Sequence, residues 1–275
     1  MSGPDARLLA RVERFVRDLL VGASRRPVRV GVSGPQGAGK STLVAALVER
    51  LEATGHRAVG LSIDDLYLTH EEQRALAAAH PGNRYLEHRG YPGTHDVELG
   101  ARLLDALCAR HPAEVRVPVY DKGAHGGRGD RMPETSWRVV RTPLDVVLLD
   151  GWMLGFVPVS SSQLVDAHLA VANERLVHYE AWHRRLDALV HLDAVDPTSV
   201  VRWRVQAERA RRDATGAGLS DEEARDYVER FLPAYALWVP GLRARAPVDG
   251  PVLRLRIDED RGLADDPPDS TPAAR

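Results

Sequence analysis

Cysteine and lysine are the residues that this sequence has least of among those that carry chemistry. Its 275 residues include one cysteine, Cys108, and two lysines, Lys40 and Lys122, against 35 arginines. A single cysteine excludes an intramolecular disulfide and any metal site of several cysteines, and it suits a reducing cytoplasm. No apolar run approaches the roughly 20 residues that cross a bilayer, and residues 1–17 lack the apolar core of a signal peptide. We therefore expect a cytoplasmic protein without membrane contact.

An excess of charge of either sign is also missing. Lys and Arg number 37 and Asp and Glu 39, which gives a net charge of −2 and no global reason to bind nucleic acid. The 44% hydrophobic and 28% charged residues are typical of a globular protein. No linker is evident between residues 25 and 258. We expect one domain over 1–262, with an N-terminal helix in 1–26 and a disordered tail at 263–275.

Hydrophobic periodicity predicts an α/β fold. Strands are expected at 28–33, 57–63, 115–120, 145–150, 188–193 and 252–257. Helices are expected at 5–24, 41–53, 71–80, 97–110, 172–185, 197–213 and 219–236. The first strand, helix and second strand form a βαβ unit, which implies a parallel sheet. The long polar connection 121–138 is expected to be functional.

A phosphate-binding pattern lies between the first strand and its helix. Residues 34–41, GPQGAGKS, match G-x-x-x-x-G-K-[ST], in which backbone N–H groups and the helix N-terminus cradle phosphates. Lys40 would reach the β and γ phosphates and Ser41 would bind Mg²⁺, so ATP and Mg²⁺ are expected. The alternative is an ordinary glycine-rich turn. The expected nucleotide-binding residues are Gly34, Gln36, Gly37, Ala38, Gly39, Lys40, Ser41 and Thr42.

A second metal ligand is expected at the end of a buried strand. Residues 146–150 are apolar up to Asp150, and the carboxyl ends of parallel strands face the ligand. Asp150 would bind Mg²⁺ together with Ser41. The alternative is a carboxylate that caps a helix or a turn.

Four further segments carry a family resemblance: 61–69, 82–96, 118–131 and 150–156. With the phosphate-binding loop they resemble the phosphoribulokinase, uridine kinase and pantothenate kinase group and, within it, the P-loop D-glycerate 3-kinase family, over roughly 28–242. The resemblance implies a P-loop NTPase-type parallel sheet flanked by helices, with a helical lid at about 197–215. It implies transfer of the γ-phosphoryl of ATP to the 3-hydroxyl of D-glycerate. That family usually has Glu where this chain has Asp150.

The resemblance also suggests the catalytic groups. Asp64, by its position relative to Tyr67, matches the family's catalytic carboxylate, and Asp65 would contact substrate or metal. Two solvated loop carboxylates are the alternative. Lys122 stands in a chain that otherwise uses Arg for positive charge, so we expect it to meet a substrate carboxylate or the transferring phosphoryl.

The remaining predictions concern the acceptor and the lid. Arg89 would bind a carboxylate, His95 lies in the same loop, and Asp96 is equally suited to cap the following helix. Asn173 is either a substrate ligand or a helix cap, while Tyr179 and Trp182 are expected in the core. The other residues expected to bind substrate are Tyr67, Tyr120 and Arg131. The arginines expected to contact the ATP phosphates are Arg202 and Arg209, and the alternative for them is a solvated helix face.

Two competing functions stay open at this point. One is another kinase of the same group, acting on a nucleoside, pantothenate or a sugar acid. The other is a non-kinase P-loop ATPase or GTPase, a switch or a metallochaperone. A switch GTPase would need an N-K-x-D segment, and neither lysine lies in one.

Overall fold

The core of the protein is a five-stranded sheet in which every neighbouring pair of strands is parallel. The computed structural model describes residues 3–215 and 219–264. The strand order is β2-β7-β1-β8-β9, which confirms the α/β prediction. The bounds are β1 Val28–Ser33, β2 Ala58–Ser62, β7 Val146–Gly151, β8 Ala188–Ala194 and β9 Val252–Ile257.

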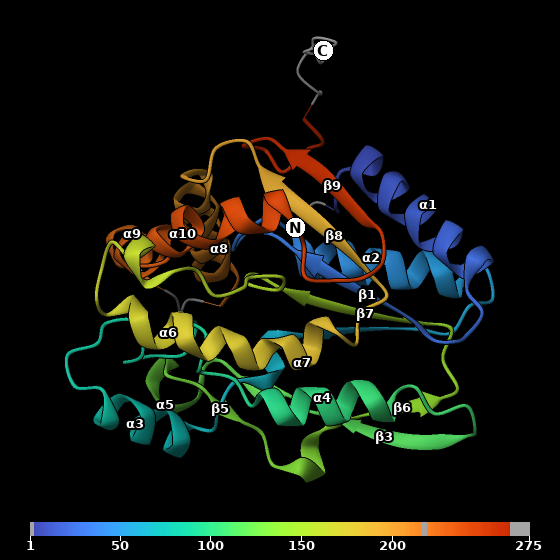
Figure 1. Ribbon diagram of the computed structural model, residues 1–275, viewed down its shortest axis with the longest axis horizontal. Coiled ribbons are helices and arrows are strands. Elements are labelled where there is room, and N and C mark those ends of the chain that lie inside the picture. Colours follow the sequence, from blue (N-terminus) through green and yellow to red (C-terminus); the bar gives the residue numbers. More distant parts are fainter. Residues whose placement is uncertain (1–2, 216–218, 265–275) are drawn as a thin grey trace.

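Helices cover both faces of this sheet (Figure 1). Helices α1 (Ala6–Gly22) and α2 (Lys40–Glu52) lie on one face, and α4 (Val97–Ala106) and α7 (Glu180–His183) lie on the other. Helix α1 begins where the Asp5 carboxylate accepts a hydrogen bond from the Leu8 N–H. Its apolar residues recur at helical spacing, so one stripe is buried against the core. The buried residues of that stripe are Leu8, Leu9, Val12, Val16 and Leu20.

The region between 113 and 142 differs from the expected single strand and long loop. Pro118 lacks the N–H that would continue the ladder, and the predicted strand 115–120 divides there. Two small antiparallel pairs result, β3 with β6 and β4 with β5. Their bounds are β3 Ala113–Val117, β4 Tyr120–Asp121, β5 Asp130–Arg131 and β6 Arg138–Thr142. Strand β6 was not predicted, and the short helix α5 (Ala124–Gly127) lies inside the expected loop.

Two predicted helices are interrupted in the structure. The expected helix 219–236 is two helices, because Pro233 begins a new one. The expected helix 172–185 consists of α6, a short 3-10 segment and α7. The remaining bounds are α3 His70–Ala79, α6 Leu169–Arg175, α8 Ser199–Thr215, α9 Asp221–Glu229 and α10 Leu232–Ala244.

The chain after β9 folds back onto the sheet. Leu263 pairs with Ile257, and the Ala264 N–H donates to the Arg256 carbonyl at 2.9 Å. The first two residues of the expected tail are therefore ordered, and its residues 265–275 lie outside the described part of the chain.

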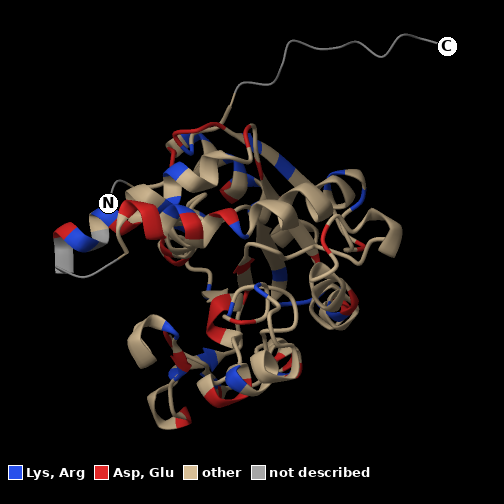
Figure 2. Cartoon of the chain, turned by 90° about the vertical axis from the view of Figure 1, so that its left-hand side faces the viewer, with Lys and Arg blue, Asp and Glu red and all other residues tan. Residues whose placement is uncertain are grey.

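Acidic and basic residues are interspersed over the helices rather than gathered on one side (Figure 2). This distribution agrees with the small net charge of −2. Within residues 3–215 and 219–264, no helix combines the length and the apolar character needed to cross a bilayer.

Candidate active site

The phosphate-binding loop connects β1 to α2 at the carboxyl edge of the sheet. Gly37 and Gly39 have φ angles of 77° and 82°, which glycine adopts without strain. Gly37 also lies so close to Trp203 of α8 that a Cβ would be 2.7 Å from the Trp203 Cβ. Helix α8, the expected lid, thus packs directly on the loop.

Lys40 is buried at the first position of α2. Its Nζ donates to the Pro35 carbonyl at 2.9 Å, which holds the ammonium across the loop. Burial lowers the pKa of Lys40, while the carboxylates of Asp150 and Asp64 oppose that shift. All three groups therefore act on one another at this edge of the sheet.

Asp150 lies at the carboxyl end of β7, one residue before its last residue, beside two hydroxyl groups. Its Oδ1 accepts hydrogen bonds from Ser41 Oγ at 3.2 Å and from Ser62 Oγ at 3.3 Å. Burial raises the pKa of Asp150 to about 6, against the nearby charge of Lys40. A hydroxyl and a buried carboxylate are hard oxygen donors, and Mg²⁺ is typically held by one or two carboxylates together with phosphate oxygens. The expected Ser41–Asp150 pair therefore fits Mg²⁺. Ser62, the last residue of β2, is a partner that sequence reasoning missed.

Asp64 and Lys122 form an ion pair between segments 58 residues apart. The Lys122 Nζ lies 2.5 Å from Oδ2 of Asp64. Loss of hydration works against the charged form of each group, but their mutual attraction outweighs it. The pKa of Asp64 is therefore lowered and that of Lys122 raised. Both members of the ion pair are therefore charged at neutral pH.

Asp65 has a hydrogen-bond partner different from that of Asp64. The segment Ile63–Leu66 is a 3-10 helix rather than the end of a strand. The Asp65 Oδ1 accepts a hydrogen bond from the Tyr120 N–H at 3.2 Å, and burial raises its pKa. Asp65 thus anchors β4, whose second residue, Asp121, directly precedes Lys122.

Arg89 and Tyr120 lie side by side beyond Lys122. The Arg89 guanidinium is 5.5 Å from the centre of the Tyr120 ring and donates to the carbonyls of Lys122, Gly127 and Arg128. Arg89 therefore holds the loop that carries Lys122. The buried Tyr120 hydroxyl has no hydrogen-bond partner among the described residues.

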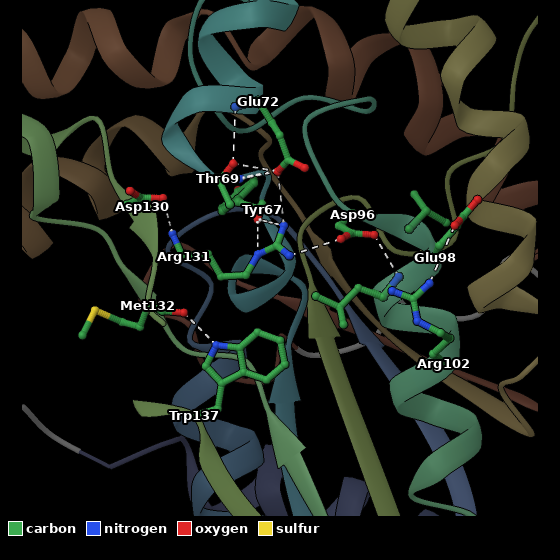
Figure 3. A network of polar contacts seen from close by, with 12 residues as sticks. Tyr67, Thr69, Glu72, Asp96, Glu98, Arg102, Asp130, Arg131, Met132 and Trp137 are labelled. Carbon is green, nitrogen blue, oxygen red and sulfur yellow. Dashed lines mark hydrogen bonds and ion pairs between the residues drawn. The ribbon is translucent and has the colours of Figure 1, made fainter. Parts of the chain in front are cut away.

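Arg131 is enclosed by protein oxygens (Figure 3). Its Nε and Nη2 donate to the Tyr67 carbonyl at 3.2 and 3.1 Å, and its Nη1 donates to Asp96 Oδ2 at 3.2 Å. Glu72 is a further 3.6 Å contact, and the side chain of Arg131 is 11% exposed. Arg131 thus joins the segment after Asp64 to the segment that holds His95. Asp96 also caps α4, as its carboxylate accepts from the Leu99 N–H.

His95 and Tyr67 stack on each other beside Asp64. Their ring centres are 4.4 Å apart at an interplanar angle of 26°, and both side chains are buried. Asp64 acts on the pKa of both rings. Tyr179, expected only as a core residue, contributes its hydroxyl to His95.

Asn173 lies away from these residues, inside α6 rather than before a helix. Its amide exchanges hydrogen bonds with the backbone of Val159, and its Oδ1 also accepts from Trp238 Nε1 at 3.1 Å. Both ends of the amide are therefore occupied by the protein.

The two expected lid arginines are each paired with carboxylates. Arg202 contacts Glu259 at 2.7 Å, and Arg209 is paired with Asp221. A third arginine, which sequence reasoning missed, reaches the phosphate-binding loop: the Arg261 Nε donates to the Gly37 carbonyl at 2.6 Å. The only signal for its position was the turn-forming composition of 258–262.

The sequence and fold of this chain were compared with those of known proteins. The model described as "Methylmalonyl Co-A mutase-associated GTPase MeaB" matches residues 7–67, which hold the phosphate-binding loop but not the segments from 82 onward. The chloroplastic D-glycerate 3-kinase of Arabidopsis thaliana is 44% identical over 243 residues, 86% of this chain and 53% of that protein. The chain thus spans about half the length of this relative.

Two other relatives are matched over nearly their whole length. The uncharacterized kinase mug58 of Schizosaccharomyces pombe is 37% identical, over 86% of this chain and 90% of that protein. The solved structure of D-glycerate 3-kinase from Cryptococcus neoformans has a TM-score of 0.82 and 31% identity, over 94% of this chain and 98% of that one. The resemblance noted in the sequence is confirmed, and the chain belongs to the D-glycerate 3-kinase family of P-loop kinases.

Proposed function

We propose that the protein transfers the γ-phosphoryl of ATP to the 3-hydroxyl of D-glycerate, with 3-phosphoglycerate and ADP as products. The observation that carries this proposal is the meeting of Lys40, Asp150 and the Asp64–Lys122 pair at one edge of the parallel sheet. A phosphate cradle, a metal-ligating carboxylate and an ionised carboxylate next to a cation are the parts that phosphoryl transfer requires.

The nucleotide is assigned to the loop 34–42. Its N–H groups and Lys40 would bind the β and γ phosphates. Ser41 and Asp150 would hold Mg²⁺, which supplies positive charge to the phosphate oxygens. In the described residues there is no cluster of three or more His, Cys, Asp or Glu suited to a metal ion, so metal binding here depends on the phosphates as further ligands.

The acceptor is assigned to the space around Asp64. Ionised Asp64 orients the acceptor hydroxyl and takes its proton as the hydroxyl oxygen bonds to the γ-phosphorus. The bond from that phosphorus to the β–γ bridging oxygen breaks, and ADP leaves with the bridging oxygen. Lys122 then has two anions to balance, the glycerate carboxylate and the moving phosphoryl, in place of its present partner Asp64.

Tyr67, Tyr120 and Arg89 surround this space, and Arg131 and Asp96 hold its frame. We propose Tyr67 and His95 as direct contacts of the acceptor, because their rings lie beside Asp64.

Arg202 and Arg209 would have to leave Glu259 and Asp221 before they could bind the ATP phosphates. A cytoplasmic location is proposed from the single cysteine, which is unpaired.

The test is a screen for ADP release with D-glycerate, L-glycerate, pantothenate, uridine and ribulose 5-phosphate as acceptors. Phosphorus NMR of the product distinguishes a phosphate on the 3-hydroxyl from one on the 2-hydroxyl. The proposal predicts D-glycerate-dependent ADP release with a 3-phosphate product. Turnover of another acceptor at a higher kcat/KM would assign the site to another kinase of the group, and ADP release independent of every acceptor would favour an ATPase.

A further inference from the structure

We propose that Tyr179 holds His95 in the neutral tautomer with its proton on Nε2, so that His95 offers one fixed hydrogen-bond donor to an oxygen of the acceptor. The identity of the acceptor rests on the proposed function, whereas the tautomer does not. Tyr179 is in this view a positioning residue, and His95 selects an acceptor that carries an oxygen next to its reacting hydroxyl.

The His95 ring is held in place from several sides. Tyr67 stacks on one face, and Trp182 meets the ring nearly edge-on, at 83°. The backbone on either side is paired as well: the Leu68 N–H donates to the Thr94 carbonyl, and the Asp96 N–H donates to the Leu66 carbonyl. These contacts hold the ring in the orientation that places Nδ1 beside the Tyr179 hydroxyl.

The hydrogen bonds of Tyr179 decide which nitrogen carries the proton. Its hydroxyl oxygen accepts from the Gly93 N–H at 2.9 Å and lies 2.8 Å from Nδ1 of His95. Tyr179 is buried, and in the described part of the chain Nδ1 is the only acceptor within hydrogen-bond distance of that hydroxyl. Were Nδ1 protonated, the buried tyrosine proton would have no partner, which costs about 1–3 kcal/mol. The hydroxyl therefore donates to Nδ1.

The imidazole is neutral, because burial lowers the pKa of His95 to about 3. A neutral ring whose Nδ1 accepts must carry its proton on Nε2. That nitrogen is buried and has no hydrogen-bond partner in the described structure. Buried donors in folded proteins are nearly always satisfied, so an unsatisfied one at an active site points to a ligand atom.

The position of His95 indicates which ligand supplies that atom. Asp64 interacts electrostatically with His95, and the effect appears in the pKa of each. We therefore expect a molecule that places a hydroxyl on Asp64 to bring a neighbouring oxygen to Nε2. Nε2–H can only donate, so it takes a carboxylate or hydroxyl oxygen and disfavours an ammonium or an apolar group at that point.

The tautomer is measured directly by long-range ¹H–¹⁵N NMR of the free protein at pH 7. The signals of His95 among the 11 histidines are identified by their loss in His95→Gln. We expect the Nε2–H pattern in the wild type and a growing share of the Nδ1–H tautomer in Tyr179→Phe. An Nδ1–H or doubly protonated ring in the wild type would overturn the proposal.

Two isosteres test the donor in the reaction. The amide nitrogen of Gln can occupy the place of Nε2, whereas that of Asn reaches only the place of Nδ1, and both changes remove the ring stacking equally. We expect KM for D-glycerate to rise about tenfold more in His95→Asn than in His95→Gln, the effect of one hydrogen bond to a charged group, with KM for ATP unchanged in both. Equal KM values would show that His95 has only a packing role.

Tyr179→Phe should raise KM for D-glycerate and lower kcat/KM, while its melting temperature should stay close to that of the wild type. The matched control is Tyr85→Phe, which also removes a tyrosine hydroxyl from a hydrogen bond, here to Asp166 at 2.6 Å, away from His95. An unchanged KM in Tyr179→Phe would count against the positioning role. If the wild type does not turn over D-glycerate while NMR shows the Nε2–H tautomer, the proposed substrate fails and the fixed donor remains.

Discussion

The ammonium of Lys122 lies 2.5 Å from the carboxylate of Asp64, although the two residues belong to loops that follow different strands. Under the proposed function, the pair would supply a base and a cation where an acceptor hydroxyl meets the γ-phosphate. Each partner can be tested separately, because Lys122 is on a peripheral loop and Asp64 follows a strand of the central sheet.

Replacing Asp64 with Asn should lower kcat by about a hundredfold or more, since general-base catalysis contributes about 10²–10⁴. KM for ATP should stay nearly constant. Steady-state kinetics measure both constants. Asp65→Asn is the matched control, because Asp65 bonds the Tyr120 N–H. A more severe loss in Asp65→Asn would move the role of base to that residue.

Lys122→Arg keeps the charge yet should raise KM for D-glycerate, lower kcat, or both, by about tenfold or more, the loss of one charge-assisted hydrogen bond. A planar guanidinium is larger and cannot fit as a point charge between a carboxylate and a phosphoryl. The exposed Arg141→Lys provides the reverse exchange on β6 as a control. Wild-type kinetics for Lys122→Arg would show that the chain tolerates either cation there.

Lys40→Ala should reduce turnover by at least about a hundredfold, as expected for the loss of a group that stabilises charge in the transition state. Because the Lys40 ammonium bonds the Pro35 carbonyl of its own loop and no other hydrogen-bond partner among the described residues, the fold should persist. Circular dichroism and thermal unfolding check the fold, and a coupled ADP assay checks the rate. Near-normal rates would rule out the nucleotide assignment.

Asp150 gives the metal-free protein a specific pH dependence. Its pKa is raised from 3.8 to about 6 in the folded state, so folding favours the protonated form. As the pH rises, the unfolded state releases this proton before the folded state does. The free energy of unfolding therefore falls by roughly 3 kcal/mol between about pH 4 and 6. Urea unfolding should therefore show Asp150→Asn gaining stability relative to the wild type over this window. A difference that does not vary with pH would contradict the shift.

Substitution of Arg131 tests whether this residue stabilises the fold or binds the acceptor. Arg131→Met removes hydrogen bonds to the Tyr67 carbonyl and Asp96, and it should lower the free energy of unfolding by about 2–4 kcal/mol. Arg141→Met on the surface should change it little. If Arg131 instead binds the acceptor directly, KM for D-glycerate would rise with unfolding unchanged.

The parts of the site that could be predicted are those whose signal is local. The phosphate-binding loop is a continuous motif, and Asp150 ends a continuous apolar run, so both follow from the spacing of a few residues. Lys122 was indicated by composition, because a chain that prefers Arg retained a lysine there. Its contact with Asp64 was not predictable, since it depends on how a distant loop folds back.

Arg131 and Asn173 have partners that residue type alone does not indicate. Arg131 was expected to bind substrate, and Asn173 either to bind substrate or to cap a helix. In the structure their polar atoms bond carbonyls and side chains distant in the chain. Such partners are determined by tertiary packing, which no local pattern records. Strand β6 escaped prediction for a related reason: it pairs with β3 outside the central sheet, where most of its residues face solvent and the apolar pattern is weak.

The tie from Arg131 to Tyr67 has a consequence for substitutions at position 67. Arg131 bonds the carbonyl oxygen of Tyr67, an atom that every amino acid supplies at that position. A change of side chain at 67 would therefore leave these hydrogen bonds in place, while it would remove the ring that stacks on His95. A single substitution at this position would thus alter the surface beside Asp64 and leave the backbone anchor unchanged.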